Sequence, residues 1–152
     1  MGTIRVWSER AMDASPATVY GCIADMREHH PHFLPAAFGD FSVESGGTGA
    51  GTVVRFTVSA GGRTRPYRMA VAEPEPGRVL TESDTGSSLV TTFTVSAHGA
   101  GSLVRIETTW NGASGIGGFF ERAFAPRAMR AIYLDELERL DAYARGRAGA
   151  SS

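Results

Sequence analysis

The fold of this chain is decided by residues 114–145, which read SGIGGFFERAFAPRAMRAIYLDELERLDAYAR. At about 100° per residue on a helix, the apolar side chains of this segment form two stripes. The stripes point about 130° apart, so one straight helix cannot bury both against the same surface. The first stripe comprises Ile116, Phe119, Phe120, Ala123 and Phe124, and the second comprises Met129, Ile132, Tyr133, Leu137, Leu140 and Ala144.

Pro126 lies between the two stripes and accounts for the change of direction. A proline inside a helix removes a backbone hydrogen bond and kinks or breaks the helix. We therefore predict a break near Ala125, followed by a firmly packed helix. The phenylalanine-rich piece before the break, residues 116–124, would roof or gate a cavity. In the alternative, Phe119 and Phe120 pack against the first helix or a partner chain.

Strand patterns and turn signals fill most of the chain before this segment. Apolar and polar residues alternate in short runs, and glycine- or proline-rich separators join them, which is typical of an antiparallel meander. We expect strands over residues 3–12, 41–44, 52–59, 64–73, 78–83, 89–97 and 103–110. The apolar face would carry Phe41, Val43, Val54, Phe56, Val58, Tyr67, Met69, Val71, Leu89, Phe93, Val95, Val104, Ile106 and Trp110. The solvent-exposed face would carry Arg55, Arg68, Thr92, Thr94, Arg105 and Glu107.

Two short helices are predicted after the first strand. Ser15 and Pro16 form an N-cap and a first helical position, and apolar residues repeat at helical spacing up to Met26. Pro31 and Pro35 limit a second helix to a turn or two. The predicted fold class is α+β, with a curved seven-stranded antiparallel sheet wrapped around the long C-terminal helix.

Composition limits the function classes that the chain can serve. A length of 152 residues fits one domain, which we place at residues 1–146 with a flexible tail at 147–152. A net charge of −1 argues against nucleic acid as a partner, and the absence of lysine excludes lysine Schiff-base chemistry. We expect Cys22 to act as a small buried apolar residue.

The sequence shows neither the apolar core of a signal peptide nor an apolar run long enough to span a bilayer. We therefore expect a cytoplasmic monomer or homodimer without stable membrane insertion.

Three motifs resemble the START and birch-pollen-allergen superfamily, often labelled SRPBCC. They are DASPATVY at residues 13–20, GGTGAGT at residues 46–52 and EPEPGR at residues 73–78. The bacterial polyketide cyclase/dehydrase-like branch is the most similar one. The resemblance implies a helix-grip fold and a function among lipid and hormone binding, quinone binding, polyketide cyclisation or dehydration, and chaperone assistance. We expect no metal and no organic cofactor.

Two motifs suggest chemistry that their context does not support. The glycines of residues 46–51 lack the Gly-Lys-Ser/Thr ending of a phosphate-binding loop and precede a strand, so we expect a tight hairpin that can rim a cavity mouth. His29, His30 and His32 are dense enough to suggest a metal, but Pro31 interrupts their register. Exposed or capping histidines, or an acid or base at the cavity mouth with His32 as candidate, remain open.

Two carboxylates and one arginine are the other candidates for polar chemistry. Glu82 alternates with Leu80 and would face inward, with Asp84 at the end of the same strand. An inward carboxylate needs a raised pKa or an arginine partner, and either can serve an acid or base. Arg122 can point toward the sheet and pair with Glu82, Asp84 or an anionic ligand group. A structural ion pair is the alternative for all three.

Three functions follow from these patterns. The first is binding of a small hydrophobic, lipid-, polyketide- or isoprenoid-like molecule between the sheet and the C-terminal helix. The second is a cyclase or dehydratase that uses Glu82, Asp84 or a cavity-mouth histidine. The third is an interaction module with Phe33, Phe38 and Phe119 exposed. The predicted ligand-binding residues are Tyr67, Met69, Glu82, Phe93, Thr108, Trp110, Phe120, Arg122, Phe124 and Tyr133.

Overall fold

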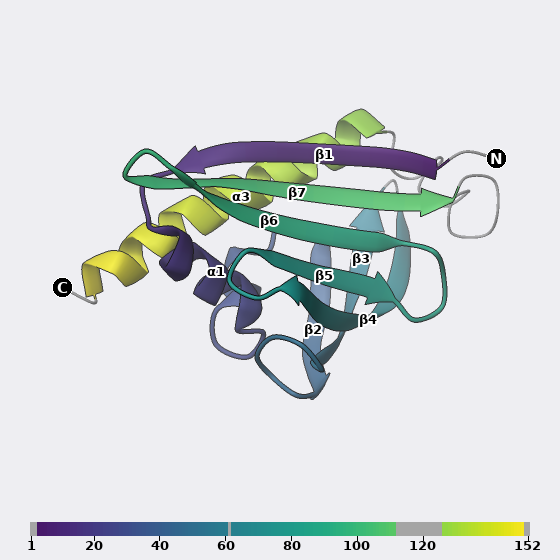
Figure 1. The fold of residues 1–152 in the computed structure, drawn as a ribbon. Coiled ribbons are helices and arrows are strands. Elements are labelled where there is room, and N and C mark those ends of the chain that lie inside the picture. Colours follow the sequence, from purple (N-terminus) through teal and green to yellow (C-terminus); the bar gives the residue numbers. More distant parts are fainter. Residues whose placement is uncertain (1–2, 61, 112–125, 151–152) are drawn as a thin grey trace.

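The computed structural model describes residues 3–60, 62–111 and 126–150, which form one antiparallel sheet with helices on one side (Figure 1). The strand order in the sheet is β1-β7-β6-β5-β4-β3-β2. All seven predicted strands are therefore confirmed. Their bounds are β1 Thr3–Met12, β2 Phe38–Ser45, β3 Val53–Ala60, β4 Arg63–Glu75, β5 Val79–Asp84, β6 Val90–His98 and β7 Gly101–Asn111.

The sheet curves strongly between its two edges. In Figure 1, strands β2 and β3 run nearly across the direction of β1 and β7. Irregular pairing between β2 and β3, at Gly39/Ser42 and Val43/Ser45, adds local bends to the right-handed twist of the strands. The curvature gives the sheet a concave face, and the predicted apolar residues of β3, β4, β6 and β7 are buried on it.

Helix α1, Pro16–Ala24, begins where the sequence predicts it. The Ser15 hydroxyl accepts a hydrogen bond from the Thr18 backbone N–H at 3.2 Å, and Pro16 occupies the first helical position. The second short helix is a single 3-10 turn, η1, His30–Phe33. Phe33 is fully buried, so it cannot belong to the exposed docking patch that the interaction-module hypothesis required.

The glycine-rich loop docks on the end of α1. The Met26 N–H donates to the Gly47 carbonyl at 2.8 Å, and the Gly49 N–H donates to the Ala24 carbonyl at 3.1 Å. Gly49 has φ +68°, and a Cβ there would lie 2.2 Å from Glu73 Oε1. Glycine is thus required for close approach, as the hairpin interpretation expects. No residue of the loop is among those that line the cavity described below.

Helix α3, Pro126–Ala150, crosses the concave side of the sheet behind β1 and β7 (Figure 1). The second predicted stripe faces the sheet, since Met129, Tyr133, Leu137, Leu140 and Ala144 are buried and Ile132 is partly buried. The helical backbone continues past residue 146, so the boundary predicted for the domain falls inside the helix. The flexibility of the tail stays a prediction. The first stripe and the break near residue 125 lie outside the described residues.

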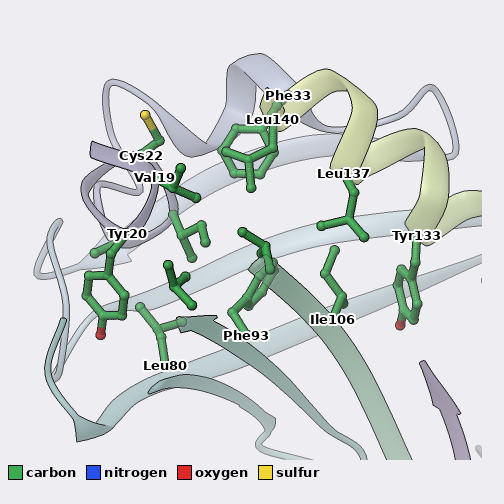
Figure 2. Packing of buried hydrophobic residues seen from close by; sticks show 14 of the residues in the cluster. Val19, Tyr20, Cys22, Phe33, Leu80, Phe93, Ile106, Tyr133, Leu137 and Leu140 are labelled. Atoms are coloured by element: carbon green, nitrogen blue, oxygen red, sulfur yellow. The ribbon is translucent and has the colours of Figure 1, made fainter. Parts of the chain in front are cut away.

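One core joins α1, η1, α3 and the concave face of the sheet. Figure 2 shows Leu137 and Leu140 of α3 packed with Phe33 of η1 and Phe93 of β6. Cys22 is 3% exposed in this core, and burial raises the pKa of its thiol, which fits a packing role. Across the described part of the chain, no helix is long and apolar enough to cross a membrane.

Candidate functional site

A cavity of about 60 Å³ lies between the concave face of the sheet, η1 and α3. A volume of this size admits a few water-sized groups, so a larger guest requires lining side chains to move apart. Methionine suits such adjustment because its chain is flexible, and Met69 and Met129 both line the space. The lining residues are His30, Leu34, Phe38, Phe41, Phe56, Val58, Tyr67, Met69, Glu82, Leu89, Thr91, Phe93, Thr108, Met129, Ile132, Tyr133 and Glu136.

A row of polar side chains crosses the otherwise apolar wall. Glu82 of β5 pairs with Thr91 of β6, and Thr91 pairs with Thr108 of β7. Directly paired residues on one face have Cβ atoms about 5 Å apart, so the three side chains are neighbours. The Thr91 and Thr108 hydroxyls are 2.7 Å apart, and Thr108 also hydrogen-bonds the Tyr133 hydroxyl of α3. The row thus connects the sheet to the helix.

Two carboxyl groups in this cavity are buried. Glu82 is 6% exposed and Glu136 of α3 is 3% exposed. Burial raises the pKa of Glu82 to about 7. The pKa of Glu136 lies well above its usual range because of burial first, and then because of the charges of Glu82 and Asp135. At neutral pH the cavity therefore holds carboxyl groups that keep or share protons.

Asp141 and Asp84, whose side chains are also largely buried, differ from this pair because they have arginine partners. Asp141 Oδ2 accepts a hydrogen bond from Arg10 Nε at 2.9 Å, and Arg145 lies 3.6 Å from its other oxygen. Asp84 lies 3.9 Å from Arg65. Among the described residues, no hydrogen bond or ion pair involves the carboxyl oxygens of Glu82 or Glu136. An acid without a partner in a cavity is a candidate for function.

His30 is the histidine that lines the cavity. Its Nδ1 lies 2.8 Å from the Ile23 carbonyl oxygen, so Nδ1 carries the proton and Nε2 is the acceptor of a neutral ring. Burial lowers the pKa of His30 to about 4. The ring packs edge-on to Phe93, with the ring centroids 5.7 Å apart. His30 is thus uncharged at neutral pH and places a hydrogen-bond acceptor in an aromatic wall.

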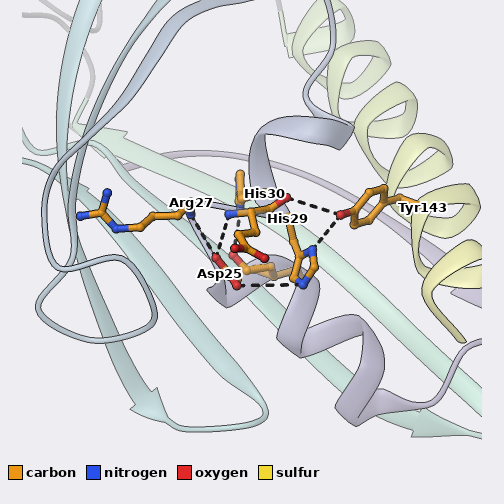
Figure 3. Close-up of polar contacts among 7 residues, drawn as sticks. Asp25, Arg27, His29, His30 and Tyr143 are labelled. Carbon is orange, nitrogen blue, oxygen red and sulfur yellow. Dashed lines mark hydrogen bonds and ion pairs between the residues drawn. The ribbon is translucent and has the colours of Figure 1, made fainter. Parts of the chain in front are cut away.

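His29 and His32 lie outside the cavity lining, and both contact Tyr143 of α3. Figure 3 shows the contact of His29 with Tyr143. His29 Nδ1 is 2.7 Å from the Tyr143 hydroxyl, and His29 Nε2 is 4.0 Å from Asp25 Oδ2. His32 is exposed and stacks on the Tyr143 ring, with centroids 5.5 Å apart. These contacts hold η1 and the residue before it against α3. Over the ranges that the structure describes, no three His, Cys, Asp or Glu side chains are grouped to hold a metal ion.

The cavity brings together six of the predicted site residues: Tyr67, Met69, Glu82, Phe93, Thr108 and Tyr133. Trp110 is buried on β7 but is not a lining residue. The weak catalytic candidate Asp84 is bound to Arg65 and Ser87 instead of facing the cavity. Phe120, Arg122 and Phe124 lie outside the described residues, so the predicted pairing of Arg122 with Glu82 or Asp84 stays a prediction.

Sequence reasoning missed Glu136 and Thr91, although each had a detectable signal. Glu136 follows Met129 by seven residues and Tyr133 by three, and this spacing places it on the buried stripe. Thr91 precedes Phe93 by two residues and so shares its face of β6. A search for apolar residues alone detects neither of them, because both side chains are polar.

Residues 3–145 match the family described as polyketide cyclase/dehydrase and lipid transport. The NMR solution structure of KanY protein (ms6282) is 36% identical, with a TM-score of 0.84 over 95% of this chain and 99% of that one. The crystal structure of TTHA0849 from Thermus thermophilus is 20% identical, with a TM-score of 0.73 over 98% of this chain and 100% of that one.

The crystal structure of Ara h 8.0201 is 15% identical, with a TM-score of 0.66 over 95% of this chain and 99% of that one. A comparison with curated proteins found no match. These findings confirm the resemblance and the helix-grip fold that the three sequence motifs implied.

Proposed function

Because the chain belongs to the polyketide cyclase/dehydrase and lipid transport family, we propose that it binds a small hydrophobic molecule between the sheet and α3. One observation carries this proposal: apolar side chains of β2, β3, β4, β6 and α3 line one cavity. A fold that surrounds a space instead of filling it loses packing energy at its walls. A bound apolar guest would restore these contacts.

Native mass spectrometry of protein purified without detergent tests the proposal. We expect a non-covalent adduct of a small molecule. Met129→Trp should reduce the adduct, because an indole on a lining residue of α3 occupies the space. Leu134→Trp is the matched control on the same helix, since Leu134 is 47% exposed.

Small apolar probes give the second arm of the same experiment. Toluene should shift the amide NMR resonances of the cavity strands in wild type and in Leu134→Trp, but not in Met129→Trp. A wild-type protein that carries no adduct and shows no shift with toluene contradicts the proposal.

Proton transfer at Glu82 is the second candidate function, and the raised pKa of this residue supports it. A general acid or base works best when its pKa lies near the operating pH, and that of Glu82 is about 7. Asp84 and His32 are weaker candidates because neither lines the cavity. Proton transfer by a carboxyl group requires neither a metal nor an organic cofactor.

Turnover of a polyketide-like substrate tests the enzymatic candidate. Glu82→Gln should lower kcat by about 10²- to 10⁴-fold if Glu82 moves the proton. Glu75→Gln, on an exposed residue of β4, is the control and should leave kcat unchanged. Equal turnover by wild type and Glu82→Gln rules out this role for Glu82.

A further inference from the structure

We propose that the cavity selects apolar molecules that carry one cationic amine or ammonium group, held between the carboxylates of Glu82 and Glu136. This inference rests on the proposed function and adds the chemical class of the ligand. It follows from the positions of the two acids, from the absence of a described cation bound to either, and from the kind of polar atom that the remaining wall supplies.

The two carboxyl groups enter the cavity from opposite walls. Glu82 comes from strand β5 of the sheet, and Glu136 comes from helix α3, which covers the sheet. Both are more than nine-tenths buried, and the charge of Glu82 acts on Glu136. Tyr133 lies one helical turn before Glu136 and is affected by both charges. A guest in the cavity therefore lies within reach of both acids.

No described cation is committed to this pair. Arg65 is the cation beside Tyr67, with its guanidinium 4.5 Å from the ring centre, and it forms an ion pair with Asp84. Arg10 and Arg145 both contact Asp141, the other buried acid of α3. The chain thus supplies arginines to its structural acids and none, among the described residues, to Glu82 or Glu136. A ligand that brings a positive charge would complete the site.

The other polar atoms of the wall do not replace a cation. The Thr91, Thr108 and Tyr133 hydroxyls bond to one another and carry no charge. His30 donates its Nδ1 proton to the Ile23 carbonyl and keeps a neutral ring. None of these groups brings a positive charge to the two acids. A cationic guest favours the ionised, hydrogen-bond-accepting form of Glu82 and Glu136, whereas a carboxylate guest would be repelled by that form.

Three isosteric probes test the charge preference: 2-phenylethylamine, 2-phenylethanol and phenylacetate, each titrated at pH 7 with NMR detection of cavity amides. We expect the amine to bind about tenfold or more tightly than the alcohol, because hydrogen bonds to charged groups contribute more than neutral ones. Phenylacetate should bind most weakly. The amine preference should decrease from pH 7 to pH 5, as both carboxyl groups become fully protonated while the amine stays charged.

Matched variants assign the preference to the two acids. Glu82→Gln and Glu136→Gln should each reduce the amine preference about fivefold or more while leaving the alcohol affinity within about twofold. Glu138→Gln changes an exposed residue of the same helix and should leave the preference intact. The wild-type pH dependence keeps the test decisive if either Gln variant fails to fold.

The outcomes separate this inference from the proposed function. An alcohol that binds as tightly as the amine, or a preference that is the same at pH 7 and pH 5, overturns the amine site and leaves hydrophobic binding standing. Tightest binding by phenylacetate overturns the amine site as well. If none of the three probes shifts the cavity resonances, the proposed function and this inference both fail.

Discussion

At the residue scale, burial of Glu82 makes the stability of the fold depend on pH. Its pKa rises from an ordinary value of 4.5 to about 7 because it is buried without a described cation. Between these pH values the folded state keeps a proton that the unfolded state releases. The free energy of unfolding contributed by Glu82 therefore falls as pH rises from about 4.5 to 7.

Replacing Glu82 by Gln should remove this decrease in the free energy of unfolding, because glutamine does not titrate. We expect the stability of Glu82→Gln relative to wild type to increase by about 3 kcal/mol between pH 4.5 and pH 7, at 1.36 kcal/mol per unit of pKa shift. Urea denaturation at several pH values measures this difference. Removing the charge also lowers the pKa of Glu136, which acts in the same direction.

His30 also makes a contribution to stability that depends on pH, so the pH profile of wild type alone does not isolate the effect of Glu82. Its pKa is lowered from 6.5 to about 4, so its contribution to stability is lost as pH falls through this range. In wild type the two residues thus oppose each other between pH 4.5 and 6.5. His30 is present in both proteins, so its contribution cancels in the difference. If the free energies of unfolding of wild type and Glu82→Gln change in parallel between pH 4.5 and pH 7, the pKa of Glu82 is not raised in the folded protein.

Some site residues were within reach of sequence reasoning and others were not. Alternation with Leu80 placed Glu82 on the inner face, and its burial confirms that orientation. His30 could not be distinguished from His29 and His32 by pattern, because a 3-10 turn has too few residues to show a period. Its docking against Phe93 and the Ile23 carbonyl decides which ring turns inward.

At the scale of the element, helix α3 offers a direct test of the predicted stripe. Leu137→Ala should lower the free energy of unfolding by about 2–5 kcal/mol, because Leu137 is fully buried and its loss leaves a cavity. Leu134→Ala, on the exposed side of the same helix, should change it by no more than about 0.5 kcal/mol. Chemical denaturation of both variants provides the measurement.

Equal losses of stability in the two leucine variants would contradict the orientation of α3. The stripe was predictable because a helix repeats every 3.6 residues and the second stripe extends over four turns. Apolar periodicity does not predict the acids on the same stripe, Glu136 and Asp141. Burial of Asp141 depends on Arg10, which lies 131 residues earlier in the chain. No local pattern reports such a partner.

At the scale of the whole molecule, the order of strands β2 to β7 follows from short connections. Each of these strands pairs with its sequence neighbour, and β1 forms one edge of the sheet beside β7. Local turns determine the first set of pairings, whereas the pairing of β1 with β7 joins residues about a hundred positions apart. The lining of the cavity combines residues from η1, α3 and every strand except β1.

The sequence by itself determined the strands, the buried stripe of α3, the N-cap of α1 and the family, because each depends on periodicity or on a short motif. The tertiary structure alone decided which acids have arginine partners and which histidine faces the cavity. These properties depend on distances between residues far apart in the chain. Glu82 and Glu136 are 54 positions apart in the numbering, and only the curvature of the sheet around α3 places both in one apolar space.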